Sequence, residues 1–391
     1  MDNQSFIQQH LSKPIPEVAL LLSKHSELDK EFILSQINGL KKAEKKLPEF
    51  FANKNIVYPV SLSIEQCSSE QTAIFKSTIL RHSGLEPESC SLIDLTGGFG
   101  IDSYYFSKQL KKVTYLEPNP ELFKIVTQNF DTLNAHHIEC VNTSAENFLK
   151  NNITTFDFAY IDPSRRNENQ KVFMLNDCVP NIVELQDEIL KIANQILIKT
   201  SPILDIKQTI QELKNVSEVW VISVDNECKE VLYLVSNKNV SNSYIYTINL
   251  AKNNQEFSFT YKEEENTIVE FSEPLKYLYE PNAPILKAGA FKSIAQHFTL
   301  KKIASNSHLY TSDDLIKDFP GRIFEVKNVL PYQAKVFKKL GIKKANVSCR
   351  NFSETVAQIK KKLNLKDGGN NYLFATINDN NKALLILTNK A

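Results

Sequence analysis

Two short segments of this chain combine acidic residues with the glycines or proline that a binding cleft requires. The first, residues 92–102 (LIDLTGGFGID), is an apolar run that ends at Asp94 and continues into three glycines. The second, residues 156–163 (FDFAYIDP), is an apolar run that ends in Asp162 and Pro163. Ligands of open α/β sheets bind at the carboxyl ends of strands. We therefore expect both acids to border one cleft.

The glycine segment is typical of a nucleotide-type cofactor site. Glycine allows a sharp turn and a close approach of the backbone to a ligand, and the helix predicted from Ile101 would begin beside that ligand with free N–H groups. A second apolar strand, residues 112–117 (KVTYLE), ends in Glu117. A carboxylate about 20 residues beyond such a loop holds a ribose diol. An ordinary strand-to-helix turn would also contain glycine, so the loop indicates a cofactor only together with Glu117.

Two departures from the dinucleotide fingerprint G-x-G-x-x-G narrow the type of cofactor. Ser103 stands where the third glycine would be, and Asp94 places a carboxylate at the end of the leading strand. A pyrophosphate prefers bare N–H groups without a facing carboxylate. An acid there suits a ligand with an ammonium group, such as the methionine end of S-adenosylmethionine. A nicotinamide-dependent oxidoreductase is therefore the less favoured alternative.

Residues 94–100 (DLTGGFG) resemble motif I of the class I S-adenosylmethionine-dependent methyltransferases, and residues 162–165 (DPSR) resemble their motif IV. Other segments resemble a bacterial subfamily that carries a THUMP-like C-terminal domain and a small ferredoxin-like insert: residues 65–70, 198–202, 226–230, 279–282, 307–312 and 350–352. The family usually places an acid beside the adenine, and Ser144 stands there in this chain. The resemblance implies S-adenosylmethionine as the cofactor and the following binding residues: Asp94, Thr96, Gly97, Gly98, Gly100, Asp102, Glu117, Ser144, Ala145 and Glu146.

Motif IV predicts methylation of a base at nitrogen. Asp162 at a strand end can accept a hydrogen bond from an exocyclic amine, and Pro163 fixes the backbone that carries it. Arg165 can stack on a base or bind phosphate. The predicted catalytic residues are thus Asp162, Pro163 and Arg165. Base N-methyltransferases carry an aromatic ring in this tetrad and this chain does not. An RNA-binding protein that has lost turnover is therefore the alternative.

Carbon methylation of a pyrimidine is less favoured. That reaction needs a covalent thiolate adduct, and related enzymes place the cysteine after the fifth strand. Residues 200–202 (TSP) occupy this place and supply no thiolate.

The order of patterns predicts an α/β fold: a Rossmann-like, seven-stranded methyltransferase sheet with an antiparallel last strand, an N-terminal helical segment and C-terminal α+β domains. The short connection at residues 225–228 cannot make a parallel crossover, so it predicts an antiparallel hairpin. We expect four parts: a helical domain at 1–70, the methyltransferase domain at 71–238, a ferredoxin-like α+β module at 239–282 and a THUMP-like domain at 283–391.

Basic residues gather in the last domain. Residues 335–366 contain nine lysines and one arginine against one acid, although the net charge of the whole chain is only +1. Such segregation is typical of a nucleic-acid-binding surface, and solubility is the alternative. The predicted RNA-binding residues are Lys343, Lys344, Arg350, Lys360 and Lys361. The expected partner is ribosomal or transfer RNA.

Composition and termini complete the expectations. The six cysteines form no C-x-x-C pair, which favours reduced thiols and argues against a metal site. No apolar run approaches the roughly 18 residues that span a bilayer. The first residues, MDNQS, lack the features of a signal peptide. We therefore expect a cytoplasmic protein without a resident metal.

Overall fold

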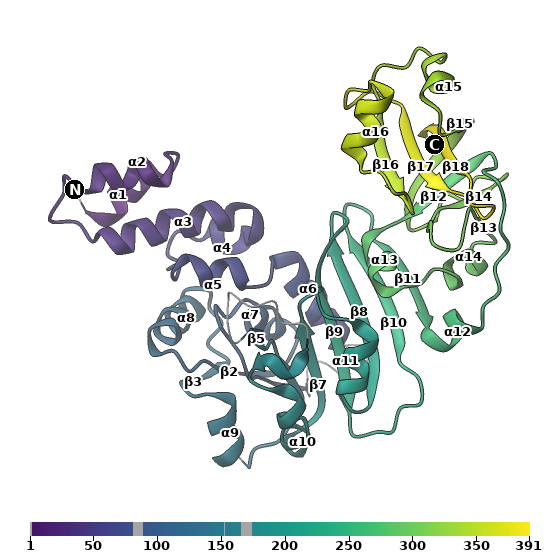
Figure 1. Ribbon diagram of the computed structural model, residues 1–391. Helices are drawn as coiled ribbons and strands as arrows, with labels where there is room; N and C mark the ends of the chain where they lie inside the picture. Colours follow the sequence, from purple (N-terminus) through teal and green to yellow (C-terminus); the bar gives the residue numbers. More distant parts are fainter. Residues whose placement is uncertain (1, 81–88, 152, 166–173) are drawn as a thin grey trace. The chain divides into compact units, whose positions relative to one another are not determined.

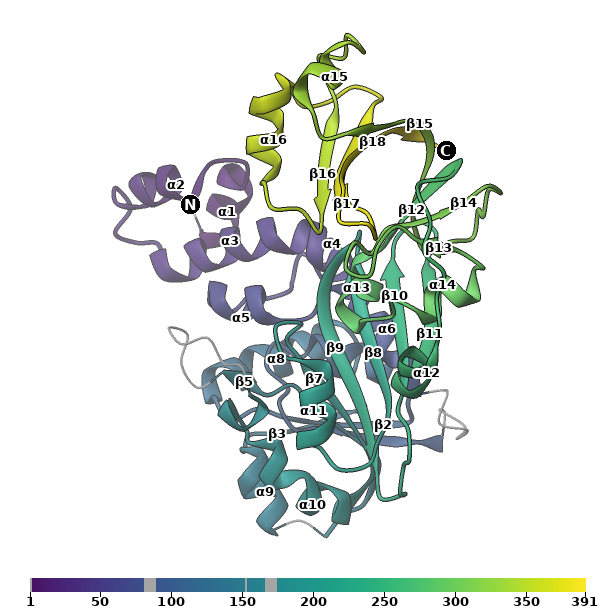
Figure 2. The ribbon, with the colours of Figure 1, turned by 45° about the vertical axis from the view of Figure 1, so that its right-hand side comes forward.

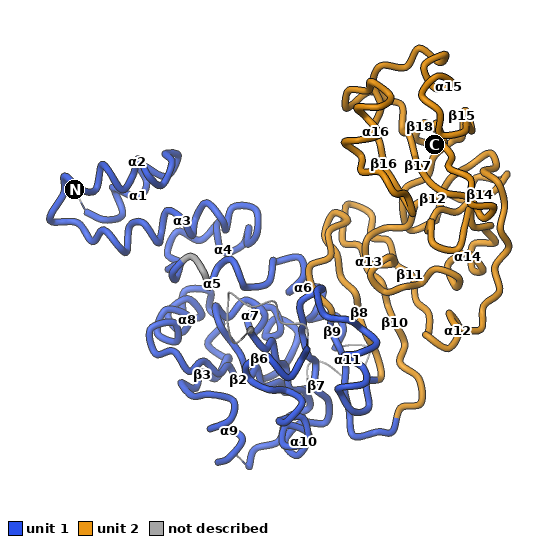
Figure 3. The backbone as a smooth tube through the Cα atoms, in the orientation of Figure 1, with its two compact units in different colours: residues 1–216, 232–239 blue, residues 217–231, 240–391 orange. Residues whose placement is uncertain are grey.

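The computed structural model describes residues 2–80, 89–151, 153–165 and 174–391 of the chain (Figure 1). The chain divides into two compact units (Figure 3). The first comprises residues 1–216 and 232–239, and the second comprises residues 217–231 and 240–391. Each unit is described by itself below.

The first unit begins with six helices. They are α1 (Asn3–His10), α2 (Ile15–Leu22), α3 (Lys30–Lys46), α4 (Pro48–Ala52), α5 (Ser61–Gln66) and α6 (Glu70–Ile79). The side chains of Asp2, Asp29 and Ser69 accept hydrogen bonds from the first turns of α1, α3 and α6, as N-caps do. Apolar residues at helical spacing make the core of α1–α3, which includes Phe6, Val18, Ile33 and Ile37.

Five parallel strands follow in the same unit: β1 (Ser91–Asp94), β2 (Lys112–Leu116), β3 (Ile138–Val141), β4 (Phe156–Ile161) and β7 (Ala193–Thr200). The helices between and after them are α7 (Ile101–Ser107), α8 (Pro120–Thr132), α9 (Ala145–Asn151), α10 (Ile182–Ile192) and α11 (Ile206–Glu212). The strands are largely buried because crossover helices cover a parallel sheet on both faces. Smaller elements after β4 are β5 (Ser164–Arg165), η3 (Leu175–Asp177) and β6 (Cys178–Val179).

Two further strands complete the methyltransferase order. β8 (Val216–Val224) and β9 (Glu227–Ser236) are joined by Asp225 and Asn226, whose φ angles of 48° and 65° define a tight left-handed turn. Such a turn makes an antiparallel hairpin. The sheet order reads β3-β2-β1-β4-β7-β9-β8. The predicted seven-stranded fold with an antiparallel strand is thus confirmed.

Beyond β8 the sheet continues with β10 (Tyr244–Leu250) and β11 (Gln255–Thr260), which bring it to nine strands. β10 lies parallel to β8, and β11 lies antiparallel to β10. Both strands fall within residues 239–282, which we set apart above as a separate module. Their hydrogen bonds instead make them an extension of the large sheet.

A second sheet fills the rest of the second unit. Its order is β13-β14-β12-β15-β18-β17-β16, formed by β12 (Tyr277–Pro281), β13 (Lys301–Lys302), β14 (Tyr310–Ser312), β15 (Gly321–Pro331), β16 (Asn346–Arg350), β17 (Tyr372–Ile377) and β18 (Ala383–Lys390). The helices of this unit are α12 (Tyr261–Asn266), α13 (Ala283–Ala288), α14 (Ser293–His297), α15 (Ala334–Lys338) and α16 (Val356–Leu363). α15 and α16 pack with β16–β18 around Phe337, Ile359 and Leu373 (Figure 2). No helix in the described ranges has the length and apolar character to cross a membrane.

Candidate active site

The loop after β1 owes its shape to its glycines. Gly98 and Gly100 have φ angles of 53° and 75°, a region that L side chains rarely adopt. A Cβ at Gly100 would lie 2.7 Å from both Phe130 and Val126, so this glycine is required for packing against α8. A Cβ at Gly98 would meet no atom closer than 3.8 Å. The Gly98 side of the loop therefore leaves room for a ligand to approach the backbone.

Glu117, the acid after β2, is bonded to this loop. Its carboxylate accepts hydrogen bonds from the backbone N–H of Gly98 at 3.0 Å and of Asn119 at 2.8 Å. The side chain is largely buried, and burial raises its pKa against the effect of these two bonds. The remaining lone pairs of the carboxylate can accept hydroxyl groups. A carboxylate with lone pairs left over fits the hydroxyl groups of the ribose of S-adenosylmethionine. The contact between Glu117 and the ribose stays a prediction.

Asp94 lies inside the site, with 1% of its surface exposed. One carboxylate oxygen accepts from the Thr96 N–H at 3.1 Å and the other from the Ser103 hydroxyl at 2.6 Å. Burial raises the pKa of Asp94 to about 7, although both hydrogen bonds oppose that shift. The carboxylate therefore ties the glycine loop to α7. Ser103, which replaces the third fingerprint glycine, is its partner. The contact between Asp94 and the cofactor's ammonium group stays a prediction.

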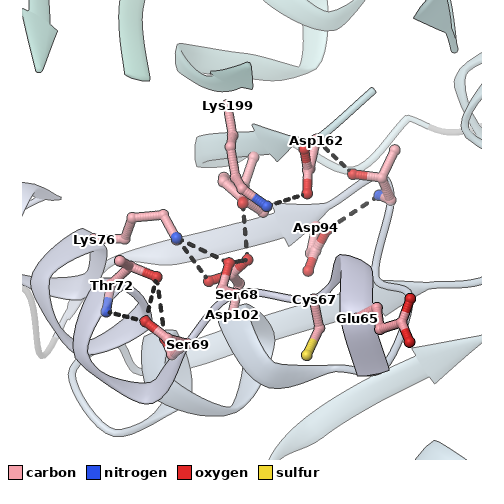
Figure 4. Close-up of polar contacts among 12 residues, drawn as sticks. Glu65, Cys67, Ser68, Ser69, Thr72, Lys76, Asp94, Asp102, Asp162 and Lys199 are labelled. Atoms are coloured by element: carbon pink, nitrogen blue, oxygen red, sulfur yellow. Dashed lines mark hydrogen bonds and ion pairs between the residues drawn. The ribbon is translucent and has the colours of Figure 1, made fainter. Parts of the chain in front are cut away.

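Asp162 follows β4 and is held from two sides. Its backbone N–H donates to the Thr96 hydroxyl at 2.7 Å, which links motif IV to the glycine loop. Its carboxylate Oδ2 lies 2.5 Å from the Nζ of Lys199, at the end of β7 (Figure 4). A third of the Asp162 side chain is exposed (33%), against a tenth for Lys199 (10%). Asp162 is thus fixed in place and still reachable by a substrate.

The other two predicted catalytic residues are less informative. Pro163 is buried beside Asp162. The backbone of Arg165 pairs in the short strand β5, and its side chain lies outside the described structure.

Asp102, at the start of α7, belongs to a buried network (Figure 4). One oxygen lies 3.2 Å from the Nζ of Lys76, which is completely buried. The other oxygen accepts from the hydroxyl groups of Ser68 at 2.7 Å and Tyr160 at 2.9 Å. Burial acts to raise the pKa of Asp102, but the charges of Lys76 and Lys199 and the hydrogen bonds from Ser68 and Tyr160 together lower it. The contacts of Asp102 brace α7 and β4, and its predicted role in cofactor binding stays a prediction.

Ser144, Ala145 and Glu146 stand at the start of α9. The Ser144 hydroxyl accepts from the Asn147 N–H at 3.3 Å and so caps this helix. Nearby, the Asn142 amide donates to the Glu117 carbonyl at 2.6 Å, which joins the end of β3 to the ribose-side acid. The adenine contact of residues 144–146 stays a prediction.

Sequence reasoning gave no role to Lys76 and Lys199, the two lysines that pair with Asp102 and Asp162. The signal was present for Lys199, because it directly follows the apolar residues 196–198 (ILI) within the predicted strand. A lysine in a buried strand needs a charged partner. Lys76 lies on the helix α6, where a lysine is usually exposed, so no pattern distinguished it.

The predicted RNA-binding residues divide into two groups. Lys343, Lys344 and Lys361 are exposed and form no ion pair within the described ranges. Lys360 pairs with Asp367, and Arg350 lies 2.7 Å from Glu280, a carboxylate that is 3% exposed. Four more exposed lysines stand in the same region without an ionic partner among the described residues: Lys335, Lys338, Lys339 and Lys366. We call these seven unpaired residues the lysine surface.

Comparison with protein families gives three matches along the chain. Residues 72–232 match the family described as conserved hypothetical protein 95. Residues 277–320 match a ferredoxin-like domain, and residues 321–390 match a THUMP domain-like family. The ferredoxin-like match thus begins near β12, after the two strands that extend the large sheet.

Several similar proteins are named as methyltransferases. A crystal structure described as a "putative methyltransferase" from Porphyromonas gingivalis W83 has a TM-score of 0.88 at 29% identity, covering 100% of this chain and 97% of that chain. The chain is 28% identical over 156 residues to a probable cobalt-precorrin-6B C(15)-methyltransferase of Methanobrevibacter smithii. It is 25% identical over 194 residues to ribosomal RNA small subunit methyltransferase J of Francisella philomiragia. These matches cover 39% and 42% of this chain, and 76% of each relative.

The sheet order, the glycine loop and these matches define the class. The chain is a class I S-adenosylmethionine-dependent methyltransferase with ferredoxin-like and THUMP-like C-terminal domains.

Proposed function

We propose that this enzyme methylates a nitrogen atom of a base in ribosomal or transfer RNA. The observation that carries the proposal is the placement of Asp162 beside the glycine loop: its backbone N–H donates to the Thr96 hydroxyl, Lys199 binds its carboxylate, and a third of its side chain stays exposed. A fixed carboxylate at a strand end can accept a hydrogen bond from an exocyclic amine and so align its lone pair. Bound S-adenosylmethionine supplies an electrophilic methyl group.

The residues that would hold the cofactor are those of the glycine loop and Glu117. Glu117 would accept the ribose hydroxyls, and the backbone at Gly98 would allow close approach. Asp94 would face the ammonium group or, through the bonds to Thr96 and Ser103, maintain the loop that binds it. After transfer, the methylated amine carries one proton too many, and Asp162 can accept that proton.

RNA is supported as the substrate by two observations. The lysine surface provides seven exposed positive charges in the domain that matches the THUMP-like family. One of the two curated relatives is named as a ribosomal RNA methyltransferase. Exposed lysines bind phosphates without regard to sequence, so they would position an RNA whose target base enters the site. We place the enzyme in the cytoplasm, where such RNA is found.

The test is transfer of labelled methyl groups from S-adenosylmethionine to RNA from cells that lack the protein. Asp162→Asn should reduce the rate about 100-fold or more, in the range of general acid–base contributions, and should leave the affinity for S-adenosylhomocysteine unchanged. Asp187→Asn is the matched control, because Asp187 is an exposed acid paired with Lys214. Full activity of Asp162→Asn would refute the proposed role. Binding of both RNA and cofactor without any transfer by the wild type would favour the binding-protein alternative.

A further inference from the structure

Lys199 occupies an unusual position for a lysine. It lies in β7, whose residues 196–200 are all buried, and β7 is the parallel neighbour of β4. Ile161 of β4 is in register with Ile198 of β7, so the next residues, Asp162 and Lys199, emerge at the same edge of the sheet. The register of two strands thus brings the lysine to the carboxylate.

The burial of Lys199 separates two possible roles. A lysine that binds RNA phosphate keeps its ammonium group in water, as the lysine surface does. Only 10% of the Lys199 side chain is exposed, and its ammonium group is directed at Asp162 (Figure 4). Burial of an ion pair contributes little to stability compared with apolar residues of similar volume. The fold alone therefore gives no reason for a lysine here.

The ion pair with Lys199 engages one of the two carboxylate oxygens of Asp162. Lys199 binds Oδ2, and no described residue is hydrogen-bonded to Oδ1. The backbone N–H of Asp162 is fixed separately by Thr96. Lys199 also acts on Asp102, whose pKa it helps to lower, so its charge lies near two carboxylates of the site.

We propose that Lys199 is a positioning residue for methyl transfer, which holds Asp162 through Oδ2 so that Oδ1 meets the acceptor amine. This inference rests on the proposed role of Asp162. It assigns Lys199 no contact with the substrate, so the whole kinetic effect of Lys199 should pass through Asp162.

Single-turnover transfer of labelled methyl groups to RNA from cells lacking the protein tests this coupling. Lys199→Met should lower the rate about 10- to 100-fold, the usual cost of a misplaced group, with the KM for RNA and the affinity for S-adenosylhomocysteine within about twofold of wild type. Lys199→Arg should restore part of the rate. Lys191→Met, at an exposed lysine on α10, is the control and should be as active as wild type.

A double-mutant cycle gives the decisive comparison. In the Asp162→Asn background, Lys199→Met should change the rate less than twofold. An equal loss in both backgrounds, or an unchanged rate in Lys199→Met alone, would overturn the inference. If Lys199→Met does not fold, Lys199→Gln replaces it, because its polar side chain is shorter than that of lysine and brings no charge to Oδ2.

A crystal structure of Lys199→Met decides the matter without any RNA. The Asp162 side chain should leave its wild-type position or occupy several. An unmoved Asp162 would contradict the inference, even if RNA were methylated. Conversely, if Asp162 is displaced in Lys199→Met while the wild-type enzyme methylates no RNA, the proposed function is refuted and the contact by which Lys199 positions Asp162 still stands.

Discussion

The charged residues of the active site and those of the lysine surface follow opposite physical rules. In the site, Lys76 and Lys199 are buried or nearly so, and each faces a carboxylate. On the lysine surface, Lys343, Lys344 and Lys361 are exposed and form no ion pair among the described residues. Buried charges must be paired, whereas exposed ones remain available to a polyanion.

The comparison shows how one residue type serves two purposes. A buried lysine that is paired with a carboxylate is held in one geometry, and it can align a reacting group. An exposed lysine has many geometries, and it contributes attraction that salt screens. Changes in the active site should therefore alter folding, cofactor affinity or rate. Changes on the lysine surface should alter RNA affinity and its dependence on salt.

The largest effect should come from the packed glycine of the loop. Gly100→Ala adds a Cβ at a left-handed φ and 2.7 Å from Phe130 and Val126. Strain and overpacking together should lower the free energy of unfolding by about 2–4 kcal/mol. Gly98→Ala is the matched control: it has a similar φ but open surroundings, so it should cost less stability and weaken cofactor binding instead. Denaturant unfolding and calorimetry measure the two effects, and equal stability of both variants would contradict this account.

Asp94→Ala should have the next largest effect, a loss of about 10- to 100-fold in affinity for S-adenosylhomocysteine. The change removes two hydrogen bonds to a charged or partly charged group, each contributing about 1.5–3 kcal/mol at most. Asp94→Asn can still bond to the Thr96 N–H and the Ser103 hydroxyl and loses only the charge. Calorimetry on both variants separates loop support from charge. An affinity of wild-type strength in Asp94→Ala would show that Asp94 serves neither purpose.

The lysine surface should show a smaller effect that depends on salt. Replacing Lys343, Lys344 and Lys361 by glutamine should weaken RNA binding and lower the slope of log affinity against log salt by about 0.7–0.9 for each phosphate that the variant no longer neutralises. The matched control replaces Lys360 and Lys362, whose charges are paired with Asp367 and Glu354. Filter binding at several salt concentrations measures the slopes. An unchanged slope in the triple variant would make the surface a solubility feature.

The last prediction concerns the dependence of stability on pH. The pKa of Asp94 is about 7 in the folded protein and near 3.8 when unfolded, so the folded state retains a proton that the unfolded state releases. Stability from this group is present below about pH 4 and is lost as pH rises towards 7, by about 1.4 kcal/mol for each pH unit. Denaturant unfolding between pH 4.5 and 7 should show that the free energy of unfolding falls more steeply with pH in the wild type than in Asp94→Asn. Parallel curves would contradict the assignment.

Much of the fold could be predicted from the sequence because its signals are local. Residue types alone predict the local geometry of three features: the glycine loop, the acids at strand ends and the short link at residues 225–228. The ion pairs of Lys76 and Lys199 could not be predicted in this way, because strand register and helix packing determine which carboxylate a buried lysine meets. The same reason explains Arg350, which was expected at the RNA surface and also pairs with the buried Glu280. The residues 239–260 read as separate strands, and only their hydrogen bonds assign β10 and β11 to the large sheet.

The central claim is that Asp162 directs a methyl group to a base in RNA. The most direct test is mass spectrometry of nucleosides from ribosomal and transfer RNA of three strains, which carry the wild-type protein, no protein or Asp162→Asn. We predict one N-methylated nucleoside that is present with the wild type and absent from the other two strains. Identical nucleoside profiles in all three strains, with Asp162→Asn stably expressed, would contradict the claim.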